Sequence, residues 1–293
     1  MRIGIDVGSS FIKAYVCGDA GSERFFMRPI AEMGMLLAGI PVRDAEAVGV
    51  VGAGFERALA DHPNLRTAVP WTIIPGADPI EAEVMAQARG VQFLMRTGDE
   101  QPALPDAYVI AGIGSGVSYT AVGPHGVHRA AFGRPDGGAA LRHAWDAYAD
   151  SLLPLEFPAF PHGADGDLIA GTADLYFQDI LPHLRGTLLG TFVASHFGAS
   201  GRDTAGESGR SAMDMLAVGI VRDLLDSRSI AAAVARATDT PDEVRTLIGV
   251  GGAVTHFPAF ATRLGAWCEQ IGWELIIPRR ADFAGAVGAA LVP

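Results

Sequence analysis

The sequence predicts an α/β protein made of two duplicated domains, each a mixed β-sheet with flanking helices. Short apolar strands alternate with helical segments along the chain, which is typical of α/β proteins. Three closely spaced strands, joined by glycine-containing turns, open the chain at residues 1–29 and return at residues 107–132. The 293 residues are enough for two domains with substantial cores.

The first domain is expected to span residues 1–100. A polar, proline-containing stretch at residues 97–106 marks its end. Alternating or continuous apolar runs predict the strands, and apolar residues at helical spacing predict the helices. Strands are expected at 1–7, 11–17, 21–29, 46–52 and 66–74, and helices at Ile30–Ala38, 54–62 and 79–95.

The second domain is expected to span residues 101–293. Its opening strands at 107–114, 117–123 and 126–132 repeat the pattern of the first domain without repeating its residues. A helix at 136–153, a buried helix at 211–236, a strand ending in a glycine turn at 244–254, a helix at 257–272 and a strand at 273–278 follow. A terminal helix at 282–292, capped by Asp282, is expected to pack back near the first domain.

Composition excludes several classes of protein. The net charge of −11 argues against a nucleic-acid-binding surface, which needs clustered basic residues. Cys17 and Cys268 are too few for a disulfide framework, so a reducing, cytoplasmic setting is expected. The N-terminus shows no leader pattern, and no apolar run approaches the ~20 residues that span a bilayer. We therefore expect no membrane partner and a cytoplasmic protein.

The first candidate motif is the hairpin from Gly4 to Lys13. A strand ends in Asp6, turns through Gly8, Ser9 and Ser10, and returns as a second strand. Glycine and serine allow backbone N–H groups to converge on a phosphate. Asp6 is a candidate Mg²⁺ ligand, directly or through water, and the chain's sole lysine adds a positive charge. The alternative is an ordinary capped hairpin.

A second glycine-rich turn lies at the corresponding point of the second domain. It contains Gly114, Ser115 and Gly116 between two predicted strands. One such turn is weak evidence, but two at equivalent positions would bind a nucleoside triphosphate between them. A third turn, at Gly251 and Gly252, follows a strand and suits close approach to a nucleotide, although it also fits any α/β fold.

Phosphorylation of a hydroxyl group also requires a carboxylate that accepts or orients the proton. Glu81 and Glu83 lie at the start of the predicted helix at 79–95. Two carboxylates in a first helical turn commonly do no more than stabilise the helix dipole. The residues alone leave both interpretations open.

Together these motifs resemble the actin/hexokinase/Hsp70 phosphotransferase superfamily and, more narrowly, type II pantothenate kinase. The matched segments occur in the family's order from residue 1 to 291. They are Gly4–Lys13, Glu81–Gly90, Ile113–Tyr119, Thr172–Leu175, Val193–Gly198 and Asp282–Ala289. The resemblance implies two ribonuclease-H-like domains around a nucleotide cleft. It also implies ATP and Mg²⁺ as cofactors and transfer of phosphate to the primary hydroxyl of pantothenate, or of a close analogue, in coenzyme A synthesis.

The resemblance also implies residue roles. Glu81 would be the catalytic base, while Ser118 and Arg129 would contact the acceptor, the arginine by pairing with its carboxylate. Gly137 and Gly138 would bind the nucleotide together with the two hairpins and the third glycine turn. The helix at 211–236 resembles the family's dimer helix, which implies a homodimer.

One segment departs from the family pattern. After Arg129 the family has a run of small residues, whereas this chain carries Phe132, Arg134, Pro135 and Asp136. A non-catalytic or altered-substrate regulatory homologue therefore remains an alternative. A second alternative is an ATPase that activates 2-hydroxyacyl-CoA dehydratases, although those proteins carry bridging cysteines for an iron–sulfur cluster.

Overall fold

The structure is a computed structural model, which describes residues 1–8, 10–18, 22–52, 71–73, 79–97, 101–134, 137 and 205–291. Several expectations fall outside these residues. They are the helix at 54–62, the helix at 136–153 except for Gly137, and the segments Thr172–Leu175 and Val193–Gly198. The site residues Ser9 and Gly138 also lie outside the described residues.

The first sheet combines an antiparallel meander with parallel strands. It contains β1 (Arg2–Val7), β2 (Phe11–Cys17), β3 (Glu23–Pro29), β4 (Ala47–Val51) and β5 (Trp71–Ile73) in the order β3-β2-β1-β4-β5. β1 pairs with β2 antiparallel and with β4 parallel. The strands expected near 1–29, 46–52 and 66–74 are therefore confirmed, the last over three residues.

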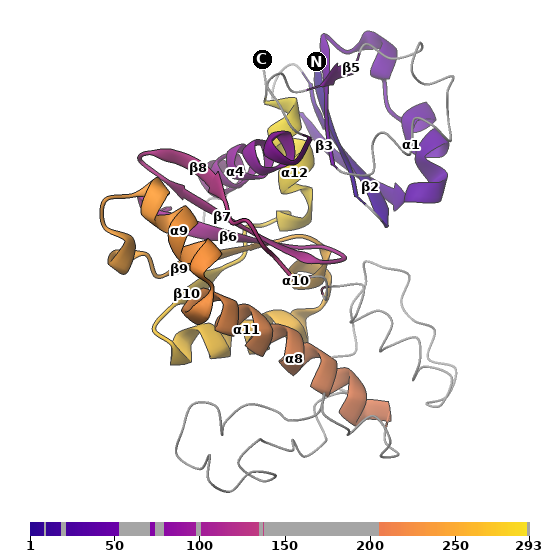
Figure 1. Cartoon of the computed structure of the whole chain (residues 1–293). Helices are drawn as coiled ribbons and strands as arrows, with labels where there is room; N and C mark the ends of the chain where they lie inside the picture. Colours follow the sequence, from indigo (N-terminus) through magenta and orange to yellow (C-terminus); the bar gives the residue numbers. More distant parts are fainter. Residues whose placement is uncertain are drawn as a thin grey trace, which may run out of the picture.

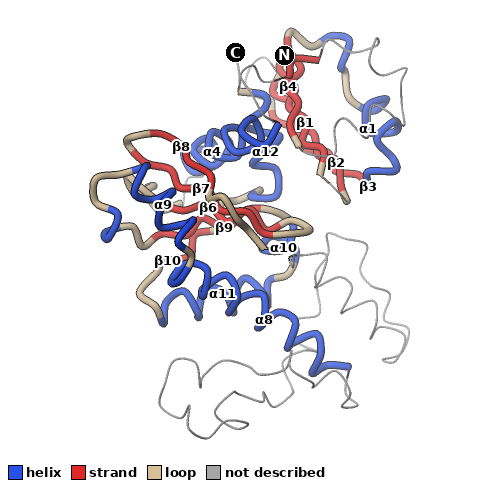
Figure 2. Tube along the Cα trace, viewed as in Figure 1, coloured by secondary structure: helices blue, strands red, loops and turns tan. Residues whose placement is uncertain are grey.

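The second sheet repeats this arrangement. It contains β6 (Tyr108–Ile113), β7 (Val117–Gly123), β8 (Gly126–Arg129), β9 (Thr246–Val250) and β10 (Glu274–Ile276) in the order β10-β9-β6-β7-β8. β6 pairs with β7 antiparallel and with β9 parallel, as β1 does with β2 and β4. The prediction of two duplicated α/β domains is confirmed (Figures 1 and 2).

The duplication extends to single glycines. Gly52 follows β4 with φ +108°, and Gly251 follows β9 with φ +104°. An added Cβ would lie 2.4 Å from the Val7 carbonyl oxygen at the first position and 2.5 Å from that of Ile113 at the second. Because both the backbone angle and the space exclude a side chain, each sheet needs glycine at this point.

Helices form three layers around the two sheets (Figure 1). α1 (Met33–Gly39) covers the outer face of the first sheet, and α4 (Pro79–Thr97) and α12 (Ala284–Ala290) lie between the sheets. α8 (Ala205–Asp226), α9 (Arg228–Ala237) and α11 (Pro258–Gln270) cover the outer face of the second. The short helix α10 (Gly252–His256) and four 3₁₀ helices complete the described elements: η2 (Ile30–Glu32), η3 (Val42–Asp44), η8 (Pro241–Glu243) and η9 (Ala281–Phe283).

Strand alternation explains the layers. Ile3 and Ile5 of β1 are buried with α1, whereas Gly4 and Asp6 point to the opposite face, toward α12. In β6, Val109 and Ala111 belong to the core beneath α8 and α9, whereas the alternate residues face the middle layer. Side chains between the sheets therefore come from both domains.

The middle layer is packed backbone to backbone. An added Cβ on Gly288 of α12 would lie 1.7 Å from the Ala86 carbonyl oxygen of α4. One on Gly90 of α4 would lie 1.9 Å from the carbonyl oxygen of Ala284 in α12. Gly4 of β1 leaves similar room for α12. The small residues of the C-terminal segment therefore place α12 directly between β1 and α4.

Two local expectations were wrong. The segment expected as one helix at 211–236 is two helices, because Ser227 ends α8 and accepts the backbone N–H of Ile230 as the N-cap of α9. Asp282 does not cap the terminal helix. Its carboxylate lies 3.1 Å from Nε2 of His256 in α10, and a buried partner across the fold replaces the local cap.

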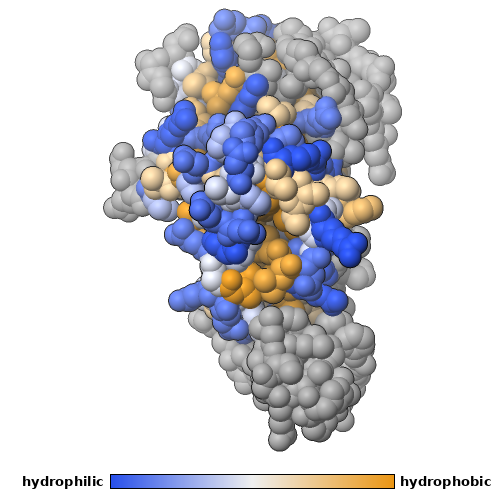
Figure 3. Space-filling model, turned by 60° about the vertical axis from the view of Figure 1, so that its left-hand side comes forward, coloured by the Kyte–Doolittle hydropathy of each residue, from blue (hydrophilic) through white to orange (hydrophobic). Residues whose placement is uncertain are grey.

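The surface is mostly polar. On the face shown in Figure 3, hydrophilic side chains cover most of the described area, and hydrophobic residues appear between them in small groups. Met35, Phe132 and Leu225 are the large hydrophobic side chains exposed in the described part of the chain. Among the helices in these ranges, none is both long and apolar enough to cross a bilayer.

Candidate functional site

Asp6 and Lys13 face each other across the first hairpin. They are a directly opposite pair of β1 and β2, so both side chains point toward the middle layer. Burial raises the pKa of the Asp6 carboxyl, and the charge of Lys13 opposes that rise. Behind Asp6 lies Gly285 of α12, where an added Cβ would come within 2.8 Å of Oδ2. The hairpin and the C-terminal helix thus hold this carboxylate from two sides.

Glu83, in the second turn of α4, lies close to this pair. The pKa of Glu83 is raised to about 7: burial raises it most, the charge of Asp6 raises it as well, and the charges of Arg129 and Lys13 lower it. Charges influence one another in this way only when they lie near one another. Two carboxylates and two cations from β1, β2, α4 and β8 therefore meet between the two sheets.

Gln87 connects Glu83 to the second hairpin. Its Nε2 donates a hydrogen bond to Oε1 of Glu83, one helical turn earlier, at 3.3 Å. An added Cβ on Gly112 of β6 would lie 3.2 Å from Oε1 of Gln87 and 2.8 Å from Oγ of Ser118. The absence of a side chain at Gly112 lets an amide from α4 and a hydroxyl from β7 approach each other.

The two hairpins are equivalent but chemically different. In the paired strands, Asp6 and Lys13 occupy the positions that Gly112 and Ser118 occupy in the second domain. The first hairpin therefore provides the charges, and the second provides a hydroxyl beside the amide of Gln87. This asymmetry gives the site a charged side and a neutral polar side.

Arg129 ends β8 at the rim of this site. It lies opposite Thr120 of β7, and its side chain is exposed. Its carbonyl oxygen accepts a 3.3 Å hydrogen bond from the guanidinium of Arg236 in α9, which helps to fix the end of the strand. An exposed guanidinium beside a partly buried carboxylate is accessible to an anionic group of a ligand.

Glu81 lies outside this cluster. Its side chain is exposed, whereas Glu83, two residues later, is partly buried. Two residues rotate a helix by about 200°, so the two carboxylates point to opposite sides. Glu83 shares its face with Gln87, Val91 and Leu94, and this spacing is visible in the sequence.

The remaining candidate residues lie in the glycine turns and beside the second sheet. In the first turn the N–H of Gly8 donates to the carbonyl of Phe11 at 3.0 Å, and Ser10 is exposed. In the second, the N–H of Gly114 donates to the carbonyl of Gly116 at 2.9 Å. The other candidates lie beside or after the second sheet. Ser115 is partly buried, Gly137 packs against Gly116, and Gly251 and Gly252 link β9 to α10.

The donor set fits Mg²⁺ held together with phosphate. Within the described ranges, no three histidine, cysteine, aspartate or glutamate side chains form a metal-binding group. Mg²⁺ at nucleotide sites needs only one or two carboxylates, because phosphates and water supply the other ligands. Asp6 alone satisfies this requirement. Lys13 can face the phosphates from the adjacent strand.

No family model matches the sequence, and no curated protein matches it either.

Solved structures of similar fold span nearly the whole chain. Component A of the (R)-2-hydroxyglutaryl-CoA dehydratase of Acidaminococcus fermentans is 17% identical over 99% of this chain and 96% of its own, with a TM-score of 0.51. The Lmo2764 protein of Listeria monocytogenes, whose proposed activity is that of an N-acetylmannosamine kinase, is 15% identical over 99% and 97%, also at 0.51. The ethanolamine utilization protein EutJ of Carboxydothermus hydrogenoformans is 13% identical over 100% and 89%, at 0.51.

At these identities the similarity concerns the fold. Two mixed sheets with flanking helices match the duplicated architecture of these proteins. The chain has the duplicated actin-like ATPase fold.

Proposed function

We propose that the chain is an ATP-dependent kinase that phosphorylates a hydroxyl group of a small molecule. The observation that carries this proposal is Glu83, a partly buried carboxylate whose pKa is raised to about 7 between the two hairpins. A general base works best when its pKa lies near the working pH. Glu83 therefore takes the role that the family resemblance gives to Glu81.

Each residue of the cluster has a task in this proposal. When bound with Mg²⁺, ATP supplies the phosphoryl group. Asp6 holds the metal ion, and Lys13 offsets negative charge on the phosphates. Glu83 accepts the proton of the acceptor hydroxyl, and the hydrogen bond from Gln87 fixes the direction of its carboxylate.

Pantothenate is the acceptor that we propose to test first. Its carboxylate suits the exposed guanidinium of Arg129, which can bind a carboxylate through two parallel hydrogen bonds. Ser118, across from Gly112, lies where a hydroxyl or amide of the acceptor would approach. A close analogue that keeps the carboxylate would fit the same groups.

The dehydratase-activator alternative requires cysteines that can reach an iron–sulfur cluster. The sequence contains two cysteines. Cys268 of α11 is completely buried in the core of the second domain, and Cys17 ends strand β2 of the first. Neither the number of cysteines nor the burial of Cys268 favours an iron–sulfur cluster, so we place this alternative second.

We also propose a homodimer, but one that does not form through the middle of α8. Residues 216–221 of α8 are all buried within the single chain. A second copy would have to use exposed positions near the end of the helix, such as Leu225. Size-exclusion chromatography with light scattering would detect loss of the dimer in a Leu225→Glu variant.

The test measures ADP formation with ATP and Mg²⁺ in the presence of pantothenate, pantetheine or simple sugars, together with ATP binding by calorimetry. The proposal predicts ADP formation that depends on one of these acceptors. ATP binding without any acceptor-dependent ADP would contradict it and favour the regulatory alternative. ADP formation that no acceptor increases would favour an ATPase.

A further inference from the structure

The chain segment after β8 lies directly on the turn of the second hairpin. We call its described residues, Phe132–Arg134 and Gly137, the strap. The N–H of Arg134 donates to the carbonyl of Val117, and the N–H of Val117 donates to the carbonyl of Arg134, both at 2.8 Å. The strap therefore adds one antiparallel bridge to the start of β7.

The strap approaches the turn too closely for side chains. An added Cβ on Gly133 would lie 2.1 Å from the carbonyl oxygen of Val117. One on Gly137 would lie 2.7 Å from the carbonyl carbon of Gly116. Since backbone lies on backbone at two points, the position of the turn depends on where the strap is held.

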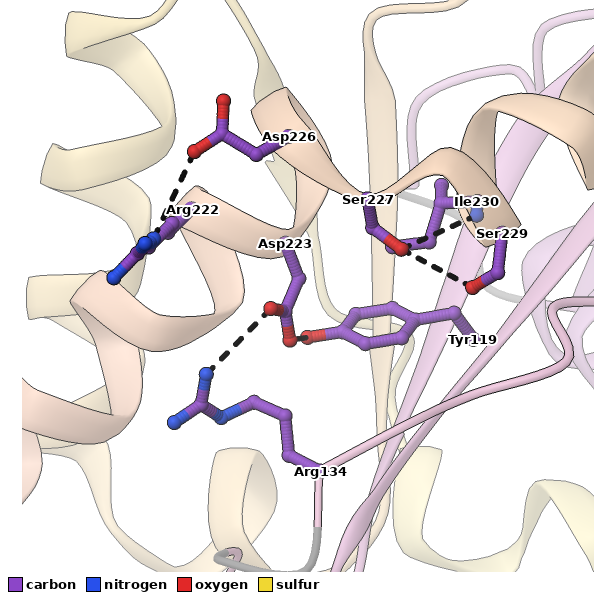
Figure 4. Close-up of polar contacts among 8 residues, drawn as sticks. All are labelled: Tyr119, Arg134, Arg222, Asp223, Asp226, Ser227, Ser229 and Ile230. Atoms are coloured by element: carbon purple, nitrogen blue, oxygen red, sulfur yellow. Dashed lines mark hydrogen bonds and ion pairs between the residues drawn. The ribbon is translucent and has the colours of Figure 1, made fainter.

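The side chain of Arg134 connects the strap to α8. Figure 4 shows the guanidinium pointing away from the hairpin toward Asp223, with 3.6 Å between a terminal nitrogen and Oδ1. The other carboxylate oxygen of Asp223 accepts a 2.8 Å hydrogen bond from the hydroxyl of Tyr119, a residue of β7. Asp223 is thereby tied both to the hairpin strand and to the strap.

Gly219 leaves the space for this connection. It lies one helical turn before Asp223 in α8, and an added Cβ would lie 2.5 Å from Cζ of Arg134. The guanidinium therefore rests on the bare backbone of the helix. Arg134 stands where the resembled family has a small residue. The strap of this chain therefore has an attachment to α8 that a small residue could not make.

We infer that Arg134 is a positioning residue, which holds the strap on the second hairpin through Asp223 and thereby sets the affinity for the nucleotide. The inference rests on the proposed function, because that proposal places the phosphates of ATP between the two hairpins. Without the ion pair the strap keeps its backbone bridge but loses its anchor on α8. The turn at Gly114–Gly116 then samples positions that do not fit the phosphates.

The Gly219→Ala variant tests the positioning role of Arg134 without lowering the stability of α8. Alanine favours a helix interior more than glycine does, so the substitution on its own does not weaken α8. Its methyl group displaces the mobile end of Arg134 and leaves Asp223, Tyr119 and the strap backbone unchanged. Gly265→Ala is the matched control, since it makes the same change inside α11 with the nearest atom, from Leu275, at 3.8 Å.

Calorimetry of the full-length chain with ATP and Mg²⁺ gives the first measurement. Gly219→Ala and Arg134→Gln should each raise the Kd, by up to about fivefold, because the free energy of one partly exposed ion pair limits the contribution of this anchor. Arg134→Lys should bind ATP more tightly than Arg134→Gln but less tightly than the wild type. Gly265→Ala should bind ATP as tightly as the wild type. The melting temperature of Gly219→Ala should not fall.

Hydrogen exchange gives the second measurement. The amide of Val117 should exchange faster in Gly219→Ala, because its partner carbonyl belongs to the strap. Equal Kd values in wild type, Gly219→Ala and Arg134→Gln would overturn the inference and leave the kinase proposal standing. A wild-type chain that does not bind ATP would overturn both.

Discussion

Glu83 of α4 and Asp6 of β1 lie close enough that the charge of Asp6 raises the pKa of Glu83. They come from the two ends of the first domain and meet because α12 brings β1 and α4 together. Gly288 and Gly90 allow α12 to contact α4 through its backbone, and Gly4 does the same at β1. The electrostatics of the site therefore depend on small residues at the other end of the sequence.

The raised pKa of Glu83 predicts a pH-dependent stability. The ordinary pKa is 4.5 and that in the folded chain is about 7, so the folded state binds the proton more tightly than the unfolded state. The contribution of this group to stability is complete below pH 4.5 and is lost as the pH rises through 7. Glu83→Gln should thus increase the free energy of unfolding at pH 8, by about 3 kcal/mol, and have little effect at pH 4.

Urea unfolding at the two pH values, without metal or nucleotide, measures this difference. Glu81→Gln is the matched control, because it removes an exposed carboxylate from the same helix. An equal change for both variants at pH 8 would show that the burial of Glu83 has no energetic consequence.

Replacing the neighbours of Glu83 should shift its pKa in opposite directions. Asp6→Asn removes a negative charge that raises the pKa, so the pKa should fall. Lys13→Met removes a positive charge that lowers it, so the pKa should rise. An NMR titration of the Glu83 carboxyl carbon, assigned by its loss in Glu83→Gln, detects both shifts. Shifts of the same sign in the two variants would contradict the arrangement of the cluster.

The contact between α4 and α12 should not tolerate a side chain. Gly288→Ala places a methyl group 1.7 Å from the carbonyl oxygen of Ala86, which only backbone movement can relieve. We expect a loss of about 3 kcal/mol in unfolding free energy, as for other overpacked sites. Gly34→Ala in the short helix α1, where no atom lies within 4 Å, is the control. Similar melting temperatures for the two variants would contradict backbone-to-backbone packing.

Much of the fold could be predicted from local pattern. β1 and β2 are short, mostly buried apolar strands joined by a glycine turn, and the same description fits β6 and β7. The break at Ser227 was missed although the residue is a typical N-cap, because the apolar spacing continues across it. The partner of Asp282 could not be predicted, because His256 lies 26 residues away and only the fold brings them together.

Part of the candidate site stands out in the sequence. The sequence identified Asp6, Lys13 and the two glycine turns because glycine, serine and charge are concentrated there. The residues alone could not choose between Glu81 and Glu83, which have the same chemistry in the same helix, and the family resemblance indicated Glu81. Burial distinguishes them, and burial depends on how α4 is rotated against β8.

The rate of acceptor-dependent ADP formation in Glu83→Gln, measured beside Glu81→Gln, tests the central claim most directly. Loss of a general base should lower kcat by about 10²–10⁴-fold in Glu83→Gln, with ATP binding retained. Glu81→Gln should stay within about twofold of the wild type, as expected for an exposed surface substitution. A full rate in Glu83→Gln together with a loss in Glu81→Gln would contradict the account and return the catalytic role to Glu81.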